Sequence, residues 1–198
     1  KEYRRQRQMC IRDSLSPLEM LYHWEKQNPN KLYMRQPIND EWHKWTWSET
    51  AMQVRKMAAY LKGLDLEPNS KIAILSKNCA HWIMTDLAIM MAGHVSVPLY
   101  PNLKEESIAQ ILEHSQTKLI FVGKLDDFDS MKGGIPKDMP AITYPFYSIE
   151  ATPVWDDLIK DVEPINEDVI RDPSDLATII YTSGTTGMPK GVMHKFYN

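Results

Sequence analysis

The chain has 198 residues, of which 43% are hydrophobic and 25% are charged, and its formal net charge is −3. These values are ordinary for a globular protein, and the weak negative charge gives no reason to expect a nucleic-acid partner. No apolar run approaches the roughly 20 residues of a membrane span, and the two cysteines are too few for a disulfide framework. Because the N-terminus shows no secretory leader, we expect a cytoplasmic protein, for which peripheral association with a membrane stays open.

Residues 1–14 differ in composition from the rest of the chain. Arg4, Arg5, Arg7 and Arg12 cluster there with few apolar neighbours. Such a segment could be an arm that binds nucleic acid or a membrane, but a disordered leader or a non-native segment explains it better. We therefore exclude residues 1–14 from the fold and expect the domain to cover residues 15–198.

Two capping boxes predict the first two long helices. Ser16 and Glu19 have the required spacing, with proline at the first helical position, and Thr46 and Glu49 repeat the pattern. We expect the first helix to end near Asn28-Pro29 and the second to end at Gly63. The second helix is expected to carry the apolar residues Met52, Met57, Ala58 and Leu61.

A β-hairpin is predicted between these helices. Residues 31–35 and 42–47 have strand character and flank Asn39-Asp40, a pair suited to a tight turn. The two-residue period places Trp45 and Trp47 on one face. Packing in the core explains these rings better than a stacking platform for bases or sugars.

Residues 71–122 alternate between apolar strands and helices. Strands are expected at 71–75, 95–100 and 119–122, and helices at 79–91 and 105–115. Asn78 is placed to cap the first of these helices. Strands that alternate with helices are typical of a parallel sheet with right-handed crossovers. We therefore predict an α/β fold in which helices flank a parallel-rich sheet.

Two groups of residues invite a metal-site interpretation. Cys79 and His81 have no partner ligands at a suitable spacing, so we expect structural roles for them. Asp126, Asp127 and Asp129 lack an ordered ligand loop, so a solvated charge cluster is preferred to a cation site.

The last third of the chain leads to a polar loop. A strand broken by Pro145 is expected at 142–147, and a helix capped by Thr152, with Asp156 and Asp157 in its first turn, is expected to follow. The apolar run Leu176–Tyr181 reads as a strand buried on both faces, and residues 191–194 read as a second short strand.

The loop between those two strands has the chemistry of an anion site. Glycines allow backbone N–H groups to converge, hydroxyls add donors, and a lysine adds positive charge. The residues are Thr182, Ser183, Gly184, Thr185, Thr186, Gly187 and Lys190. A Walker A loop is excluded because only two residues separate Gly184 from Gly187. A hairpin turn without a ligand is the alternative.

Residues 179–190 resemble the phosphate-binding signature of the adenylate-forming (AMP-binding) superfamily, which includes acyl-CoA synthetases, luciferases and adenylation domains. Residues 78–82 and 97–101 are similar to the long-chain fatty acid–CoA ligase branch. The resemblance covers about residues 15–198. It implies part of a large N-terminal domain, truncated after the phosphate loop, because members of the superfamily are much longer.

The resemblance implies a two-step reaction. A fatty acid would react with ATP to form an acyl-adenylate, and coenzyme A would then displace AMP. Thr182, Ser183, Gly184, Thr185, Thr186 and Gly187 would hold the β- and γ-phosphates, Thr185 would face Mg²⁺, and Lys190 would be catalytic. Later catalytic residues of the superfamily lie beyond residue 198, so we expect this stretch alone to be inactive. The alternatives are a ligase that loads a carrier protein and a non-catalytic nucleotide-binding module.

Two residues after the loop bear on the substrate. Phe196 stands where many members of the superfamily carry histidine in the acyl site, which puts the acid preference in doubt. His194 could serve as a catalytic base, although a structural role at the end of a strand explains it better.

Overall fold

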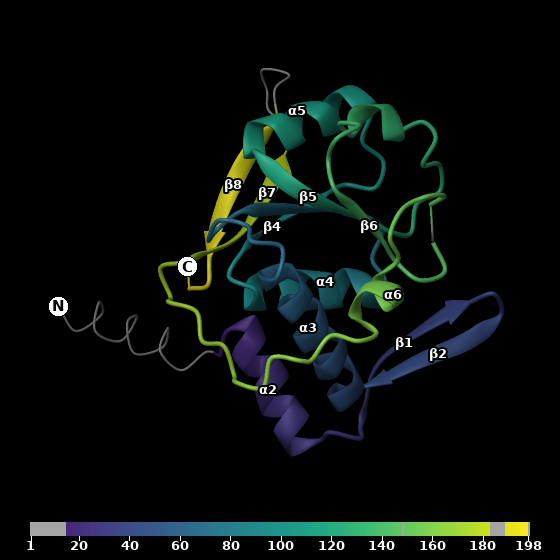
Figure 1. The fold of residues 1–198 in the computed structure, drawn as a ribbon. Helices are drawn as coiled ribbons and strands as arrows, with labels where there is room; N and C mark the ends of the chain where they lie inside the picture. The colour runs from purple at the N-terminus through teal and green to yellow at the C-terminus, as the bar shows by residue number, and fades with distance from the viewer. Residues whose placement is uncertain (1–14, 148, 183–188, 198) are drawn as a thin grey trace.

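A six-stranded sheet forms the centre of the protein, with helices on both faces (Figure 1). The structure is a computed structural model that describes residues 15–147, 149–182 and 189–197. In sheet order, the strands are β6 (Ala141–Thr143), β5 (Thr117–Val122), β3 (Lys71–Leu75), β4 (Val95–Leu99), β7 (Leu176–Thr182) and β8 (Lys190–Lys195).

The strand pairing confirms the predicted α/β architecture. β3 pairs in parallel with β4 and β5, β5 pairs in parallel with β6, and β4 pairs in parallel with β7. Only the last pair in the sheet, β7 with β8, is antiparallel. The parallel order requires crossover segments, and the helices between the strands supply most of them.

The helices divide between the two faces of the sheet. α5 (Glu105–Ser115) and the short 3-10 helix η1 (Lys132–Gly134) cover one face (Figure 1). The other face carries α2 (Pro17–Gln27), α3 (Trp47–Lys62), α4 (Ala80–Met91) and α6 (Trp155–Ile159). None of the helices in the described ranges is long and apolar enough to cross a membrane.

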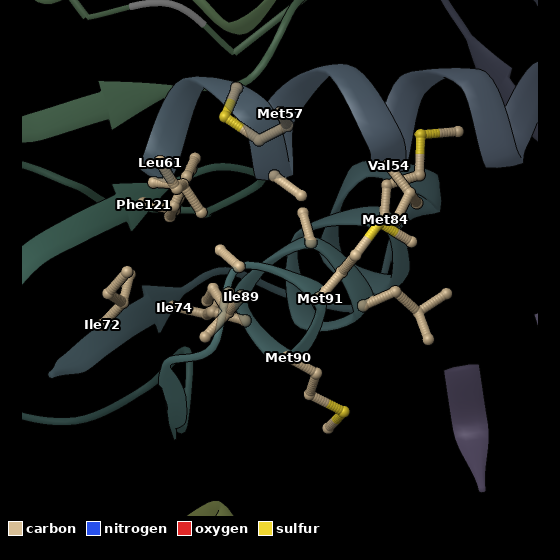
Figure 2. Close-up of a cluster of buried hydrophobic side chains, with 14 of the residues drawn as sticks. Val54, Met57, Leu61, Ile72, Ile74, Met84, Ile89, Met90, Met91 and Phe121 are labelled. Atoms are coloured by element: carbon tan, nitrogen blue, oxygen red, sulfur yellow. The ribbon is translucent and has the colours of Figure 1, made fainter. Parts of the chain in front are cut away.

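The larger of two apolar cores lies where α3 and α4 pack on β3 and β5. Figure 2 shows Met57 and Leu61 of α3 above Ile72 and Ile74 of β3, with Phe121 of β5 beside them. All five side chains are fully buried. Of the apolar residues expected on α3, Met57, Ala58 and Leu61 are buried, whereas Met52 is 45% exposed.

Both predicted capping boxes form. The Glu19 backbone N–H donates to Ser16 Oγ, and the Ser16 N–H donates back to the Glu19 carboxylate at 2.8 Å. Thr46 and Glu49 repeat these bonds at the start of α3. Each box satisfies two backbone N–H groups that a helix otherwise leaves without a partner.

Two other predicted caps are wrong. The N-cap of α4 is Cys79 rather than Asn78, and its side chain makes no capping bond. Instead, the Ala80 N–H donates to the side-chain oxygen of Gln36, in the hairpin, at 2.8 Å. The N-cap of α6 is Val154 rather than Thr152, again without a side-chain cap.

The predicted hairpin consists of β1 (Leu32–Ile38) and β2 (Glu41–Thr46). Asn39 and Asp40 have φ angles of 50° and 66°, as a tight hairpin turn requires. The expected pairing of Trp45 and Trp47 on one face is wrong, because Trp47 already belongs to α3. Trp45 contacts His81 edge-on, whereas Trp47 stacks on Tyr33.

Two strand predictions also need correction. β6 ends at Thr143, and the chain turns at Phe146, whose φ is 69°, so no strand continues to residue 147. Burial along β7 alternates between buried and half-buried side chains, so this strand is not buried on both faces. Ile179 and Tyr181 pack in the core beside α5, whereas Thr178 and Ile180 are only half-buried.

Candidate functional site

The predicted phosphate loop joins β7 to β8. Thr182, the last residue of β7, lies opposite Lys190, the first residue of β8, in the antiparallel register. This pair closes the neck of the loop. Residues 183–188 lie outside the described residues, so the phosphate contacts expected for Ser183, Gly184, Thr185, Thr186 and Gly187 stay predictions.

A cavity of about 750 Å³ opens beside this neck. Thr182 and Pro189 border it on one side, and Tyr100, Asn102 and Ser107 border it on the other. It lies beyond the carboxyl ends of β4 and β7, where parallel sheets commonly bind their ligands. Its volume is that of a small-molecule site.

The far wall of this cavity was not predicted from the sequence. Tyr100 and Asn102 follow β4 directly, and Ser107 lies in the first turn of α5. Residues that follow the carboxyl ends of adjacent parallel strands lie together at one edge of the sheet. These wall residues could therefore have been predicted from the sequence only if β4 and β7 had been known to be neighbours in the sheet.

Lys190 brings positive charge to the neck of the loop. Its side chain is exposed, and no carboxylate is ion-paired with it among the described residues. An exposed ammonium group on a flexible stem can reach an anion held in the loop. The position of Lys190 is therefore compatible with the role predicted from the sequence.

Two contacts hold β7, one near its amino end and one near the phosphate loop. The Thr178 hydroxyl donates to the Ser96 carbonyl of β4 at 3.0 Å. On the other face, the Tyr181 hydroxyl lies 2.7 Å from Nδ1 of His114 in α5. Burial raises the pKa of the Tyr181 hydroxyl above its ordinary value, so the group remains protonated near neutral pH. These bonds fix the strand from which the loop departs.

The residues after the loop lie further from it. His194 pairs with Thr178, at the end of the hairpin away from the loop. Phe196 is buried, and the Arg171 guanidinium lies over its ring at 5.2 Å. In the described part of the chain, Phe196 belongs to the core cluster, and its proposed place in an acyl site stays a prediction.

The residues considered for metal binding have other contacts. Asp126 forms an ion pair with Lys77, and Asp129 forms one with Lys132. His81 is enclosed by aromatic rings, and burial lowers its pKa to about 4. Within the described ranges, no group of three or more His, Cys, Asp and Glu side chains is placed to hold a metal ion.

The sequence is similar to known ligases. It is 28% identical over 180 residues to the long-chain-fatty-acid–CoA ligase FadD15 of Mycobacterium bovis, and the match covers 87% of this chain and 30% of the relative. The chain thus spans less than a third of the length of this curated relative.

The fold is similar to the solved structures of a CoA ligase and of an N-terminal subdomain. The anthranilate CoA ligase AuaEII matches with a TM-score of 0.78 at 21% identity, over 92% of this chain and 35% of that one. The N-terminal subdomain of Klebsiella oxytoca NpsA matches with a TM-score of 0.65 at 23% identity, over 91% and 42%. At these identities the likeness shows the fold alone, and the fold is that of an N-terminal subdomain of adenylate-forming enzymes.

The family model for AMP-binding enzymes matches residues 21–198, which include all of the sheet, the walls of the cavity and both ends of the loop. The match therefore covers the fold and the candidate site together. This chain belongs to the AMP-binding enzyme family.

Proposed function

We propose that the protein containing this chain uses ATP to convert a carboxylic acid to an acyl-adenylate and then transfers the acyl group to coenzyme A. The observation that carries the proposal is the loop neck formed by Thr182 and Lys190 at the edge of a ligand-sized cavity. Membership of the AMP-binding enzyme family and similarity to CoA ligases support it.

Each residue of the site has a separate task in this proposal. The loop amides and hydroxyls bind the phosphates of ATP, and Lys190 neutralises charge that develops on the departing pyrophosphate. Thr182 contributes a hydroxyl at the cavity wall. Thr185 remains our candidate for contact with Mg²⁺, which would supply further charge neutralisation when bound with ATP.

The acid is proposed to be a medium- or long-chain fatty acid. The support is the similarity to FadD15, which is named as a long-chain-fatty-acid ligase.

The test is acid-dependent exchange of labelled pyrophosphate into ATP by the full-length protein. We expect exchange with fatty acids, a loss of at least about tenfold in Lys190→Ala, and little change in Lys195→Ala, which removes a lysine from the far end of the same strand. Equal exchange by wild type and Lys190→Ala would remove Lys190 from the mechanism.

A second measurement, the loss of free thiol when coenzyme A is added, separates the alternatives. Exchange without loss of the coenzyme A thiol would indicate a carrier protein or an amine as acceptor. ATP binding without exchange for any acid would indicate a nucleotide-binding module and would overturn the proposed activity.

A further inference from the structure

A second hollow lies on the opposite face of the sheet from α5, between α2 and α4. Its volume is about 300 Å³. The helices that form it cover the sheet face away from the cavity at the phosphate loop (Figure 1). The hollow is therefore separate from the proposed adenylation site, and the proposed reaction does not use it.

Aromatic rings make up much of its wall. Trp24 comes from α2, Trp47 from the start of α3, and Trp82 from α4. Tyr33 of the hairpin stacks on Trp47 with ring centroids 3.7 Å apart, and Trp24 stacks on Trp47 at 6.0 Å. Ring faces carry negative electrostatic potential, so a wall of this kind attracts cations.

Among the described residues, Asp86 is the one charged side chain in this wall. It projects from α4 one turn after Trp82, so the carboxylate and the indole lie on one side of the helix. None of the ion pairs in the described ranges involves Asp86. Burial raises the pKa of its carboxyl group, and the neighbouring Ser96 hydroxyl opposes that rise only in part.

The rim of the hollow is open to solvent. Met20 and Ile83 border it and are 41% and 36% exposed. A ligand that fills the hollow would remove more water from Asp86, which is unfavourable unless the ligand carries a positive charge. A neutral apolar ligand would leave that cost uncompensated. A bare metal ion would find a single carboxylate and no further ligands.

We propose that the hollow binds a small organic cation of the alkylammonium or trimethylammonium class. The apolar methyl groups would contact the rings of Trp24 and Trp82, which flank the stacked Trp47, and the charge would lie beside the Asp86 carboxylate. Aromatic walls with a nearby carboxylate suit quaternary ammonium groups, because such ions are large, weakly hydrated and unable to donate hydrogen bonds. The proposal is independent of the adenylation activity.

The test compares two ligands of the same shape on the full chain. Choline and 3,3-dimethylbutan-1-ol differ in the replacement of the cationic nitrogen by a neutral carbon. We expect saturable binding of choline, an upfield shift of its methyl proton resonance from the ring currents, and at least about tenfold weaker binding of the alcohol. Equal affinity for the two ligands, or no saturable binding of choline, would overturn the proposal.

Two substitutions test whether choline binds beside Asp86. Asp86→Asn keeps the shape of the side chain and removes its charge, so choline affinity should fall by about tenfold while the alcohol is unaffected. Asp157→Asn, an exposed acid on α6, is the matched control and should change neither. Unchanged choline affinity in a folded Asp86→Asn protein would also contradict the proposal. The wild-type comparison of the two ligands stands even if that variant fails to fold.

Discussion

The ring of Tyr181 lies against Gly191, directly across the β7–β8 pair. These residues are partners in the antiparallel register, one residue outside the neck of the phosphate loop. A Cβ atom on Gly191 would lie 2.8 Å from Ile179 Cγ2 and 3.1 Å from Tyr181 Cζ. The ring therefore occupies the space that any larger residue at position 191 would need.

Gly191→Ala should accordingly destabilise the hairpin. We expect the free energy of unfolding to fall by about 1–3 kcal/mol, since Ile179 and the Tyr181 ring must move. Urea unfolding followed by tryptophan fluorescence measures the change. Gly63→Ala is the control, because its φ is −74° and its added Cβ would come no closer than 3.3 Å to another atom. Equal effects of the two substitutions would show that the Tyr181 contact is unimportant.

The hydrogen bond between Tyr181 and His114 gives a second prediction. Tyr181→Phe keeps the ring and removes the hydroxyl, and should lower the free energy of unfolding by about 1 kcal/mol. His114→Phe should cost a similar amount, and the double variant should cost little more than either, because both remove one bond. Additive losses in this double-mutant cycle would show that the two side chains do not interact.

Arg55 ties the segment around residue 168 to the helices. Its guanidinium donates to the Glu25 and Asp168 carboxylates at 3.0 and 2.7 Å and to the carbonyls of Ile165 and Glu167. The side chain is only 10% exposed. Removal would leave carboxylates and carbonyls without their donor, so Arg55→Leu should reduce stability by roughly 3 kcal/mol.

Lys26→Ala provides the matched control for Arg55. Lys26 also pairs with Asp168, at 3.1 Å, but its side chain is 72% exposed. An exposed pair contributes about 0–1 kcal/mol, so this loss should be small and should shrink further in high salt. Thermal or urea unfolding of both variants gives the comparison, and a similar loss for both would contradict the assigned role of Arg55.

His81 should make stability depend on pH. Burial among aromatic rings lowers its pKa to about 4, against 6.5 in the unfolded chain. Between these values the unfolded state binds more protons, so stability should fall as pH decreases from 6.5 towards 4. The full effect corresponds to roughly 3 kcal/mol.

Replacement of His81 by an aromatic residue isolates this contribution. His81→Phe should show a smaller loss of stability between pH 6.5 and 4 than the wild type. Some dependence should remain, because burial and the Arg171 charge lower the pKa of His94 as well. Urea unfolding at several pH values measures both proteins, and parallel curves would show that His81 is not responsible.

Much of the local structure followed from the sequence alone. The capping boxes at Ser16 and Thr46, the turn at Asn39-Asp40, and the bounds of β3 and α5 were all predicted correctly. Each depends on residues only a few positions apart, whose interactions are the same in any fold. The phosphate-binding role of the loop from Thr182 to Lys190 stays a prediction, because residues 183–188 lie outside the described part of the chain.

Only the tertiary structure decided which distant residues meet. The cap of α4 comes from Gln36, 44 residues before Ala80, and the partner of Tyr181 is 67 residues away. Trp45 and Trp47 separate, Met52 turns outward, and Tyr100 reaches the cavity because of the way helices and strands pack. Periodicity gives each element an apolar face, but the neighbours that cover that face, and the hollows they leave, are set by the arrangement of the whole sheet.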